Sequence, residues 1–415
     1  MRVGPQPLDP DAPRHGPLAG VRVLALEQMQ AMPFGTQLLA RLGADVVKVE
    51  HPVTGDLGRG SLPAMVDGAG KRAGATFLRN NLGKRSICVD LKSPAGRELI
   101  LRLAPRFDIV GENFKGGAAA KMGLGYEDVR AVHPGVIYLS VSGFGNTVPS
   151  PYGGWPAYAA IAEAMSGMYD WKRPAAVPPN PSPVGALGDI GSSLFGIIGV
   201  LAALHHRDRT GQGTYVDVAM FDSMMAFADV VANYWSMGER PDPGEGLKMI
   251  LDGFEAGTGW LIIQVGREHE FERLADLVGH PEWVTDERFA TRVGWRRHMD
   301  VLRAGVKEWA ASMTNTEACH ALAGAGIAAG PVFSAQQVID DPHLRARDMI
   351  VELERTDGPA DPVVIPGNPV RLVGFESQPE ARPPWQGEHT DSVLEAELGL
   401  TAFELDELRG QGVIA

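Results

Sequence analysis

The feature that most constrains the fold is a repeated alternation of short apolar runs with amphipathic stretches near the start of the chain. VRVLAL (21–26) and ADVVKVE (44–50) are typical of strands, and PFGTQLLARLG (33–43) between them has helical spacing with a glycine stop. Two consecutive strands joined through a helix run parallel, and their crossover is right-handed. The opening of the chain therefore predicts a parallel β-helix-β unit.

The same alternation continues to about residue 150. RSICVDL (85–91), FDIVGENF (107–114) and GVIYLSVSGFG (135–145) indicate further strands, and SPAGRELILRLA (93–104) indicates an amphipathic helix. Together these segments predict an open, Rossmann-like α/β sheet. In such a sheet the ligand loops lie at the carboxyl ends of the strands.

The rest of the chain is less regular. Residues 1–18 are polar and proline-rich, which predicts a loose arm, and WKRPAAVPPNPSPV (171–184) predicts a loop or lid. An apolar helix (189–206), a strand (214–220) and a second helix (224–235) are expected to follow. MGERPDPGEG (237–246) is typical of a linker. The remaining expectations are a smaller α/β region from WLIIQV (260–265) to about residue 340, then strands in VVIPGNPVRLVGF (363–375) and a final helix in ELDELRGQG (404–412).

Charge and composition exclude several classes of protein. The formal net charge of −13 disfavours general binding of nucleic acid, because an acidic surface repels phosphate backbones. Cys88 and Cys319 have no metal-like spacing and fit a reduced, cytoplasmic setting. The N-terminus has no apolar signal region, and the stretch 194–204 is too short to span a bilayer, so we expect no membrane segment.

The nucleotide-binding motifs are absent from the sequence. The first turn reads EQMQAMPFG rather than GxGxxG, so the backbone lacks the glycines that let a pyrophosphate approach, although Glu50 ends the second strand where a ribose-binding acid would lie. No GxxxxGK[ST] or GxSxG motif occurs. These absences disfavour binding of NAD or FAD, hydrolysis of nucleoside triphosphates, and an α/β-hydrolase.

The histidines do not indicate a metal site. His205 and His206 are neighbours on a predicted helix, so their side chains point to different sides. His389 in GEHT has the chemistry of a base or a ligand, but a loop histidine with a satisfied hydrogen bond explains it as well. We predict no metal.

One carboxylate stands out, at the start of the apolar helix in GALGDIGSSLFGIIGVLAALHHR (185–207). Asp189 is a favoured residue for a helix N-cap, which is the structural interpretation. Glycines 185, 188 and 191 around it would also leave space for a substrate, and a helix that is apolar nearly all round would be buried and hold the carboxylate rigidly. Such a carboxylate can act as a covalent nucleophile.

A series of motifs resembles one known family, the CaiB/BaiF (family III) coenzyme A transferases, which include formyl-CoA transferase and 2-methylacyl-CoA racemase. The resemblance covers nearly the whole chain from about residue 17, and its combination of motifs is specific although each motif alone is weak. The segments that carry it are PLAGVRVLALEQMQAMPFGTQLLARLGADVVKVEHPVTGDLGR, NLGKRSICVDLKSPAGRELI, ENFKGGAAAKMGLGYEDV, VIYLSVSGFG, GDIGSSLFGIIGVLAAL, GQGTYVDVAMFDSM and GEHTDSVLEAELGLTAFELDELRGQGVI.

The resemblance implies a large α/β domain built from both chain ends, with a smaller α/β domain inserted between them. It also implies an interlocked homodimer in which two ring-shaped chains pass through each other. The expected parts are the N-terminal part of the large domain at 1–220, a linker at 221–245, the small domain at 246–340, and the return linker with the C-terminal part of the large domain at 341–415.

The resemblance also implies site residues. Asp189 falls on the family's catalytic aspartate. Lys121 stands where some members have an arginine, so it keeps the charge but loses the bidentate fork. His51 also replaces an arginine, which puts that phosphate contact in doubt, and Lys84 and Arg85 are further basic candidates or solvated surface charges. The positions expected to contact coenzyme A are Gln30, Ala31, Val89, Asp90, Leu91, Lys92, Asn113, Phe114, Lys115, Lys121 and Tyr158.

One position separates the two main branches of the family. In PAYAAIAEAMSG (156–167), Tyr158 and Ala159 stand where the racemases have a histidine and an aspartate. Racemisation needs two acid/base groups, and an unperturbed tyrosine, with a pKa of about 10, is a poor base at neutral pH. The chemistry favours transfer over racemisation.

We therefore predict an acyl-CoA:carboxylate CoA transferase that works through an acyl-aspartate and an aspartyl-CoA thioester. Coenzyme A enters as part of the substrate, so the resemblance implies no permanently bound cofactor and no ATP or metal. The expected partners are acyl-CoA, a carboxylic acid and a second copy of the chain. Two alternatives remain open: a 2-methylacyl-CoA racemase or epimerase, and an inactive acyl-CoA-binding homologue.

Overall fold

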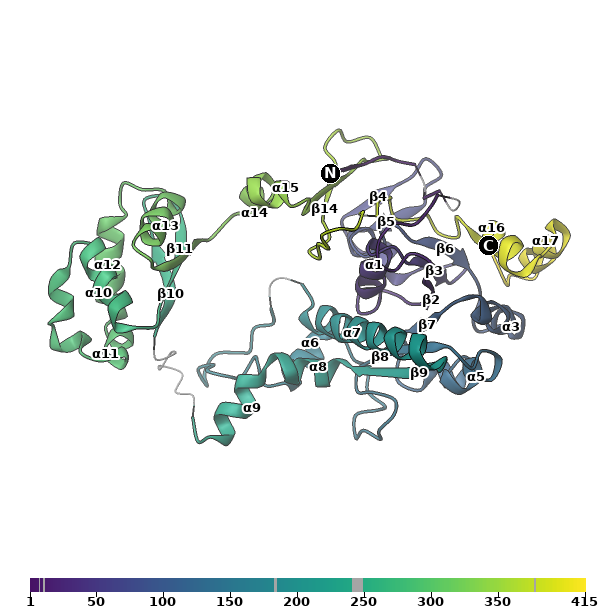
Figure 1. The fold of residues 1–415 in the computed structure, drawn as a ribbon, viewed down its shortest axis with the longest axis horizontal. Helices are drawn as coiled ribbons and strands as arrows, with labels where there is room; N and C mark the ends of the chain where they lie inside the picture. Colours follow the sequence, from purple (N-terminus) through teal and green to yellow (C-terminus); the bar gives the residue numbers. More distant parts are fainter. Residues whose placement is uncertain (7, 10–11, 183–184, 241–248, 377) are drawn as a thin grey trace. The chain divides into compact units, whose positions relative to one another are not determined.

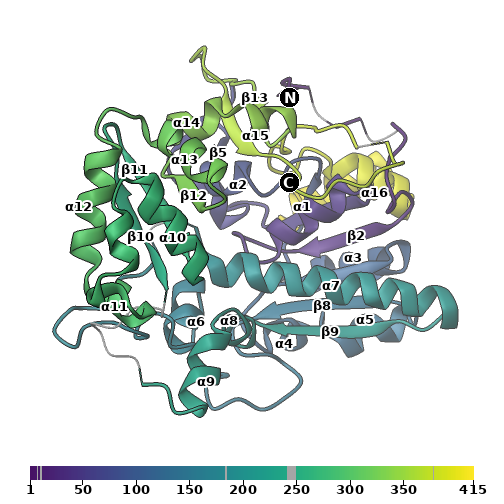
Figure 2. The same ribbon diagram turned by 60° about the vertical axis from the view of Figure 1, so that its left-hand side comes forward.

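A computed structural model describes residues 1–6, 8–9, 12–182, 185–240, 249–376 and 378–415. They form two compact units (Figures 1 and 2). The first consists of Met1–Tyr169, Asn180–Ala232 and Pro342–Ala415, and the second of Asp170–Pro179 and Asn233–Asp341. Residues 241–246 of the predicted linker, and residues 183 and 184 of the predicted proline-rich loop, lie outside the described residues.

The first unit is built on a six-stranded sheet whose neighbouring strands are all parallel, which confirms the sheet predicted from the sequence (Figure 1). Val23 lies opposite Val46 on one side and opposite Ile109 on the other. In spatial order the strands are β6 (Arg85–Cys88), β3 (Asp45–Glu50), β2 (Arg22–Leu26), β7 (Ile109–Glu112), β8 (Ile137–Ser142) and β9 (Thr214–Ala219).

Helices cover both faces of this sheet. Alternate residues of a strand point to opposite faces, so Val23 and Ala25 pack with α1 and α7, whereas Leu24 and Leu26 pack with α3 and α16. The helices of this unit include α1 (Pro33–Arg41), α2 (Ala75–Leu78), α3 (Pro94–Leu103), α4 (Ala118–Lys121), α5 (Tyr126–Val132), α6 (Ala159–Met165), α7 (Leu187–Thr210), α8 (Met220–Phe227), α15 (Pro342–Ala346), α16 (Thr390–Leu398) and α17 (Ala402–Gly410).

Helix α7 differs from the expectation that it would be buried all round. Val200 and Leu204 pack on the sheet, but Ile198 is 62% exposed, and Leu194, Phe195 and Leu201 are also exposed. By length and composition α7 is the one helix in the described part of the chain that could span a membrane, and half of its apolar window is buried within the protein. The side of α7 that faces the sheet therefore packs into the core of the protein.

The start of the chain is more ordered than predicted. Residues 2–3 form β1 (Arg2–Val3) rather than a loose arm, because the strand pairs with β13 (Ile350–Leu353) and buries Val3. Strand β13 pairs in turn with β14 (Val363–Pro366), which is shorter than the predicted strand region. A separate short hairpin is formed by β4 (Ala64–Val66) and β5 (Arg72–Gly74).

The helix predicted at 224–235 begins earlier and is divided. Helix α8 starts at Met220 and ends at Phe227, and α9 (Asp229–Ser236) follows after Ala228. The second unit contains an antiparallel sheet packed on helices, and WLIIQV forms its central strand. Its elements include β10 (Ile250–Glu255), β11 (Trp260–Val265), β12 (Ala328–Pro331), α10 (Glu268–Leu277), α11 (Arg292–Arg297), α12 (Met299–Trp309), α13 (Asn315–Gly324) and α14 (Ala335–Asp340).

Candidate active site

The candidate site lies in the first unit, at the edge where the parallel strands end. The loop that starts at Glu27 follows β2, and the loop that starts at Asn113 follows the neighbouring strand β7. Helix α7 leads back into β9, which runs parallel to β8, so the first turn of α7 lies at the same edge. This is the edge at which open α/β sheets bind ligands.

Asp189 is the third residue of α7 rather than its N-cap. The cap position is held by Ala186, which makes no side-chain cap bond, so the structural interpretation of Asp189 as a capping residue is wrong. Within the described residues, the Asp189 carboxylate accepts no hydrogen bond, and the side chain is half-buried. Both of its oxygens therefore keep their capacity to accept hydrogen bonds or to form a bond with a substrate atom.

The glycines around Asp189 mainly serve helix packing, which corrects the expectation that all three leave room for a substrate. A Cβ atom on Gly188 would lie 2.8 Å from Cα of Ala159 in α6, and one on Gly191 would lie 2.4 Å from the Phe227 ring in α8. Only Gly185, at φ +65°, has no closer neighbour than 4.0 Å. Gly188 and Gly191 thus let α7 pack closely against α6 and α8.

Two charged side chains that the sequence did not single out act on Asp189. Burial, and next the negative charge of Glu163, raise the pKa of Asp189 to about 6, whereas Arg79 opposes the shift. Glu163 is the one acid within α6 and is 2% exposed. Arg79 follows α2, and no local pattern in the sequence indicates that it reaches Asp189.

The predicted coenzyme A residues Gln30 and Ala31 lie in the loop between β2 and α1. Both are buried, and the Gln30 side-chain oxygen accepts a hydrogen bond from the Arg79 guanidinium at 2.8 Å. Helix α1, which follows this loop, packs on α7, because Gly35 lies against Ile197 and the Ser193 carbonyl. Arg79 therefore bonds to Gln30 and acts on the charge of Asp189. Gln30 precedes α1 and Asp189 lies in α7, and these two helices pack on each other.

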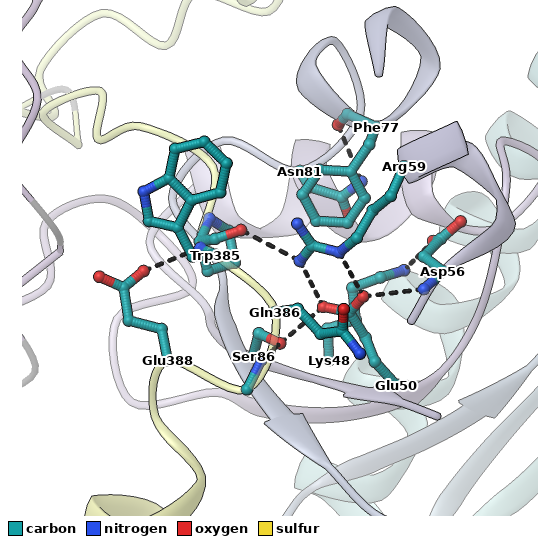
Figure 3. A network of polar contacts seen from close by, with 12 residues as sticks. Lys48, Glu50, Asp56, Arg59, Phe77, Asn81, Ser86, Trp385, Gln386 and Glu388 are labelled. Atoms are coloured by element: carbon teal, nitrogen blue, oxygen red, sulfur yellow. Dashed lines mark hydrogen bonds and ion pairs between the residues drawn. The ribbon is translucent and has the colours of Figure 1, made fainter. Parts of the chain in front are cut away.

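A network of buried charges supports this loop, and Figure 3 shows the part of it around Lys48 and Asp56. The Lys48 amine lies 2.7 Å from the Asp56 carboxylate and donates to the Glu27 carbonyl at 3.0 Å. The other Asp56 oxygen accepts the backbone N–H of Met29, a residue with φ +62°. Lys84 lies 2.7 Å from the Glu27 carboxylate, and Lys84 and Lys48 lower the pKa of Glu27 although burial alone would raise it. The backbone just before Gln30 is therefore fixed by ion pairs.

The same network occupies Glu50, the residue that would bind a ribose in a dinucleotide site. Arg59 donates to both Glu50 oxygens at 2.6 Å, and Ser86 donates to one of them (Figure 3). Lys84 is completely buried, and Arg85 pairs with Asp45. Lys84 and Arg85 are thus structural cations rather than solvated surface charges or free phosphate ligands.

The predicted coenzyme A residues Asn113, Phe114 and Lys115 follow β7, in a loop that lies against the loop containing Gln30. The Asn113 side chain accepts from the Gln28 N–H at 2.9 Å and donates to the Gln28 carbonyl at 2.8 Å. Phe114 is half-buried, and the exposed Lys115 donates to the Gly154 carbonyl at 2.6 Å. Two of the segments predicted from the sequence therefore meet at one place.

The other predicted residues lie further along the edge or at the surface. Val89 is buried and bridges to Ile414, and the Asp90 carboxylate accepts the N–H of Lys92. These residues follow β6, which β3 separates from β2. Of the remaining predicted positions, Leu91 is half-buried, and Lys92, Lys121 and Tyr158 are exposed.

The two histidines considered in the sequence have local partners. His51 Nδ1 accepts the backbone N–H groups of Val53 and Thr54, so it stabilises a turn. The buried His389 accepts the Ser86 N–H through Nδ1, which is the satisfied loop histidine of the simpler interpretation.

A cavity of about 410 Å³ lies elsewhere in the first unit and contains none of the predicted site residues. Its walls include Arg41 and Arg371, which pair with Glu380 and Asp348. Because two of its arginines are paired with acids and none of the predicted site residues lines it, we place the candidate site at Asp189 instead.

Comparison with known proteins supports the motifs found in the sequence. The family model described as CoA-transferase family III matches residues 18–390. The succinyl-CoA:mesaconate CoA-transferase of Haloarcula marismortui is 35% identical over 402 residues, which cover 94% of this chain and all of the relative. The succinate–glutarate CoA-transferase of Agrobacterium fabrum is also 35% identical, over 93% of this chain and 96% of its own length.

Solved structures agree with these sequence relatives. A CaiB/BaiF family protein from Brucella suis superposes with a TM-score of 0.80 and 33% identity, covering 92% of this chain and all of the other. The Rv3272 protein of Mycobacterium tuberculosis gives a TM-score of 0.76 and 30% identity, covering 92% of this chain and 99% of the other. The resemblance inferred from the motifs is confirmed.

Proposed function

Since this chain belongs to CoA-transferase family III, the CaiB/BaiF family, and moves CoA between acyl-CoA and carboxylic acids, we propose that Asp189 carries the acyl group during the transfer. The proposal rests on the half-buried carboxylate in the first turn of α7. Within the described residues it accepts no hydrogen bond, although Arg79 acts on its charge. With a pKa of about 6, the carboxylate is mostly ionised at neutral pH, as a nucleophile must be.

The proposed reaction conserves the energy of the thioester. An Asp189 oxygen bonds to the thioester carbonyl carbon, the carbon–sulfur bond breaks, and the CoA thiolate leaves a mixed anhydride. The thiolate then bonds to the aspartyl carbonyl carbon and releases the donor acid, which leaves an aspartyl-CoA thioester. An acceptor carboxylate attacks that thioester, and the returning thiolate converts the new anhydride into the product acyl-CoA and free Asp189.

We further propose a small dicarboxylic acid as donor or acceptor. The relatives are named for mesaconate, glutarate and oxalate, all of which are diacids. Arg79 offers a second carboxylate a cation near Asp189, because its guanidinium is held by Gln30 and acts on the Asp189 charge. A mass-spectrometric screen of CoA esters against mono- and dicarboxylic acids tests this choice, and preference for monoacids would contradict it.

We also propose that two copies of the chain form an interlocked homodimer. The outward side of α7 exposes Leu194, Phe195, Ile198 and Leu201, and Phe227 of α8 is 57% exposed. Contiguous apolar surface of this kind is typical of an interface. Sedimentation of the purified protein tests this, and a monomer at micromolar concentration would contradict it.

The central experiment is Asp189→Ala. We expect acyl transfer to fall by at least about 10³-fold, because the covalent path is removed, while the Kd for CoA changes little. Asp208→Ala, an exposed acid at the other end of α7, is the matched control and should keep full activity. Retained turnover in Asp189→Ala would refute the assignment.

Trapping with hydroxylamine separates transfer from the alternatives. An acyl-aspartate at position 189 yields a hydroxamate that mass spectrometry can locate, whereas an inactive acyl-CoA-binding protein yields none. Exchange of the α-proton for deuterium in heavy water, without transfer, would instead indicate a racemase.

A further inference from the structure

Glu163 is a buried carboxylate that the proposed chemistry leaves without a role. One oxygen accepts the backbone N–H of Gly188 at 3.0 Å, and the other accepts the hydroxyl of Tyr169. Gly188 precedes Asp189 in the chain, and its N–H is one of the donors at the start of α7 that have no partner within the helix. Glu163 therefore holds the backbone to which the proposed nucleophile is attached.

Packing fixes this arrangement. Helices α6 and α7 touch where Gly188 meets Ala159, since a Cβ on Gly188 would lie 2.8 Å from the Ala159 Cα. Ala159 and Glu163 are four residues apart in α6 and so lie on the same face of that helix. Glu163 thus projects from the contact face toward the first turn of α7.

Among the described residues, one negative and one positive side chain act on the charge of Asp189. Glu163 of α6 places a negative charge near it, and Arg79, which follows α2, places a positive charge. Arg79 donates to Gln30, and Tyr169 donates to Glu163, so both charges are held by neighbours. Burial, with the repulsion from Glu163 next, raises the pKa of Asp189.

We propose that Glu163 is a positioning residue for acyl transfer, which fixes the first turn of α7 and favours the acylated form of Asp189 over the free carboxylate. The repulsion between the two carboxylates exists only while Asp189 is charged. It is lost when Asp189 becomes a neutral anhydride or thioester, so Glu163 destabilises the resting state relative to the covalent intermediates. This inference rests on the proposed function of Asp189.

Glu163→Gln tests the role of the charge. Glutamine can still accept from Gly188 and bond to Tyr169, so it removes the charge and keeps the contacts. We expect the acidic limb of the pH profile of kcat/KM to move down by about one pH unit. The hydroxamate trapped at steady state should fall severalfold.

Arg79→Gln is the matched variant, and we expect it to move the acidic limb in the opposite direction. It retains a donor for Gln30 and removes the positive charge, so the acidic limb should move to higher pH. A merely structural role for Glu163 would lower turnover or Tm without moving the limb. If Glu163→Gln folds poorly, Glu163→Met must give the same downward movement, and an unmoved limb in a folded variant overturns the inference.

A direct titration separates this inference from the proposed function. The pKa of Asp189 can be measured by ¹³C NMR on protein labelled at the aspartate carboxyl carbon, with Asp189→Asn assigning the signal. If Asp189→Ala is inactive but the pKa is the same in wild type and Glu163→Gln, the inference fails alone. If Asp189→Ala keeps its turnover, the proposed function fails whatever the titration shows.

Discussion

Two groups of charged side chains in the first unit differ in how their charges are balanced. The network that supports the loop after β2 contains three acids, Glu27, Glu50 and Asp56. Each of them pairs with Lys48, Arg59 or Lys84. At the start of α7, Asp189 is subject to one like charge, from Glu163, and one opposite charge, from Arg79, and it has no ion-pair partner among the described residues.

The difference shows in the pKa values. Despite burial, Arg59 and Lys84 hold the pKa values of Glu50 and Glu27 below their usual range. The pKa of Asp189 instead rises to about 6, because burial and Glu163 outweigh Arg79. A balanced buried network stabilises and positions a loop, whereas burial together with a nearby like charge raises the pKa of a carboxylate, as is common at functional sites.

The largest effect is expected from breaking the balanced network. Lys48→Met should lower the free energy of unfolding by about 3–5 kcal/mol, because Asp56 would remain buried without its cation. Urea unfolding measures the change, with the exposed Lys92→Met as control. A loss no larger than that of the control would show that the network contributes little.

At Asp189 we expect a smaller change in stability, and in the opposite direction: the substitution should raise the free energy of unfolding. Its folded-state pKa is raised from 3.8 to about 6, so wild-type stability should decline as pH rises from about 4 to about 6. Asp189→Asn lacks this decline and should be more stable above pH 6 by on the order of 1–2 kcal/mol, since water partly screens a half-buried group. Thermal unfolding at pH 4 and 7.5 checks this, with Asp208→Asn as control. An equal difference at both pH values would contradict the raised pKa.

The smallest effect is expected for an exposed ion pair in the second unit. Hydrogen bonds from Arg292 lower the pKa of Glu268 to about 2, but the pair is exposed and screened by water and salt. Glu268→Gln should therefore leave Tm unchanged within error at neutral pH. A clear drop in Tm would mean that charge pairing matters as much at this surface as in the buried network.

Local patterns in the sequence were sufficient for the main sheet and for the family. The short apolar runs and amphipathic stretches predicted β2, α1, β3 and the later strands, because each pattern depends on neighbouring residues. The glycine-flanked Asp189 and the absence of a GxGxxG turn also led to a predicted site at the start of α7 rather than a dinucleotide site after β2.

Long-range contacts decided the rest. The sequence alone determined a parallel α/β sheet, the family and a candidate nucleophile at residue 189. Only the tertiary structure decided that Lys48 and Lys84 are buried partners of acids, that Gly188 and Gly191 serve helix packing, and that Glu163 and Arg79 act on Asp189. Burial and charge pairing depend on residues far apart in the chain, so no local periodicity records them.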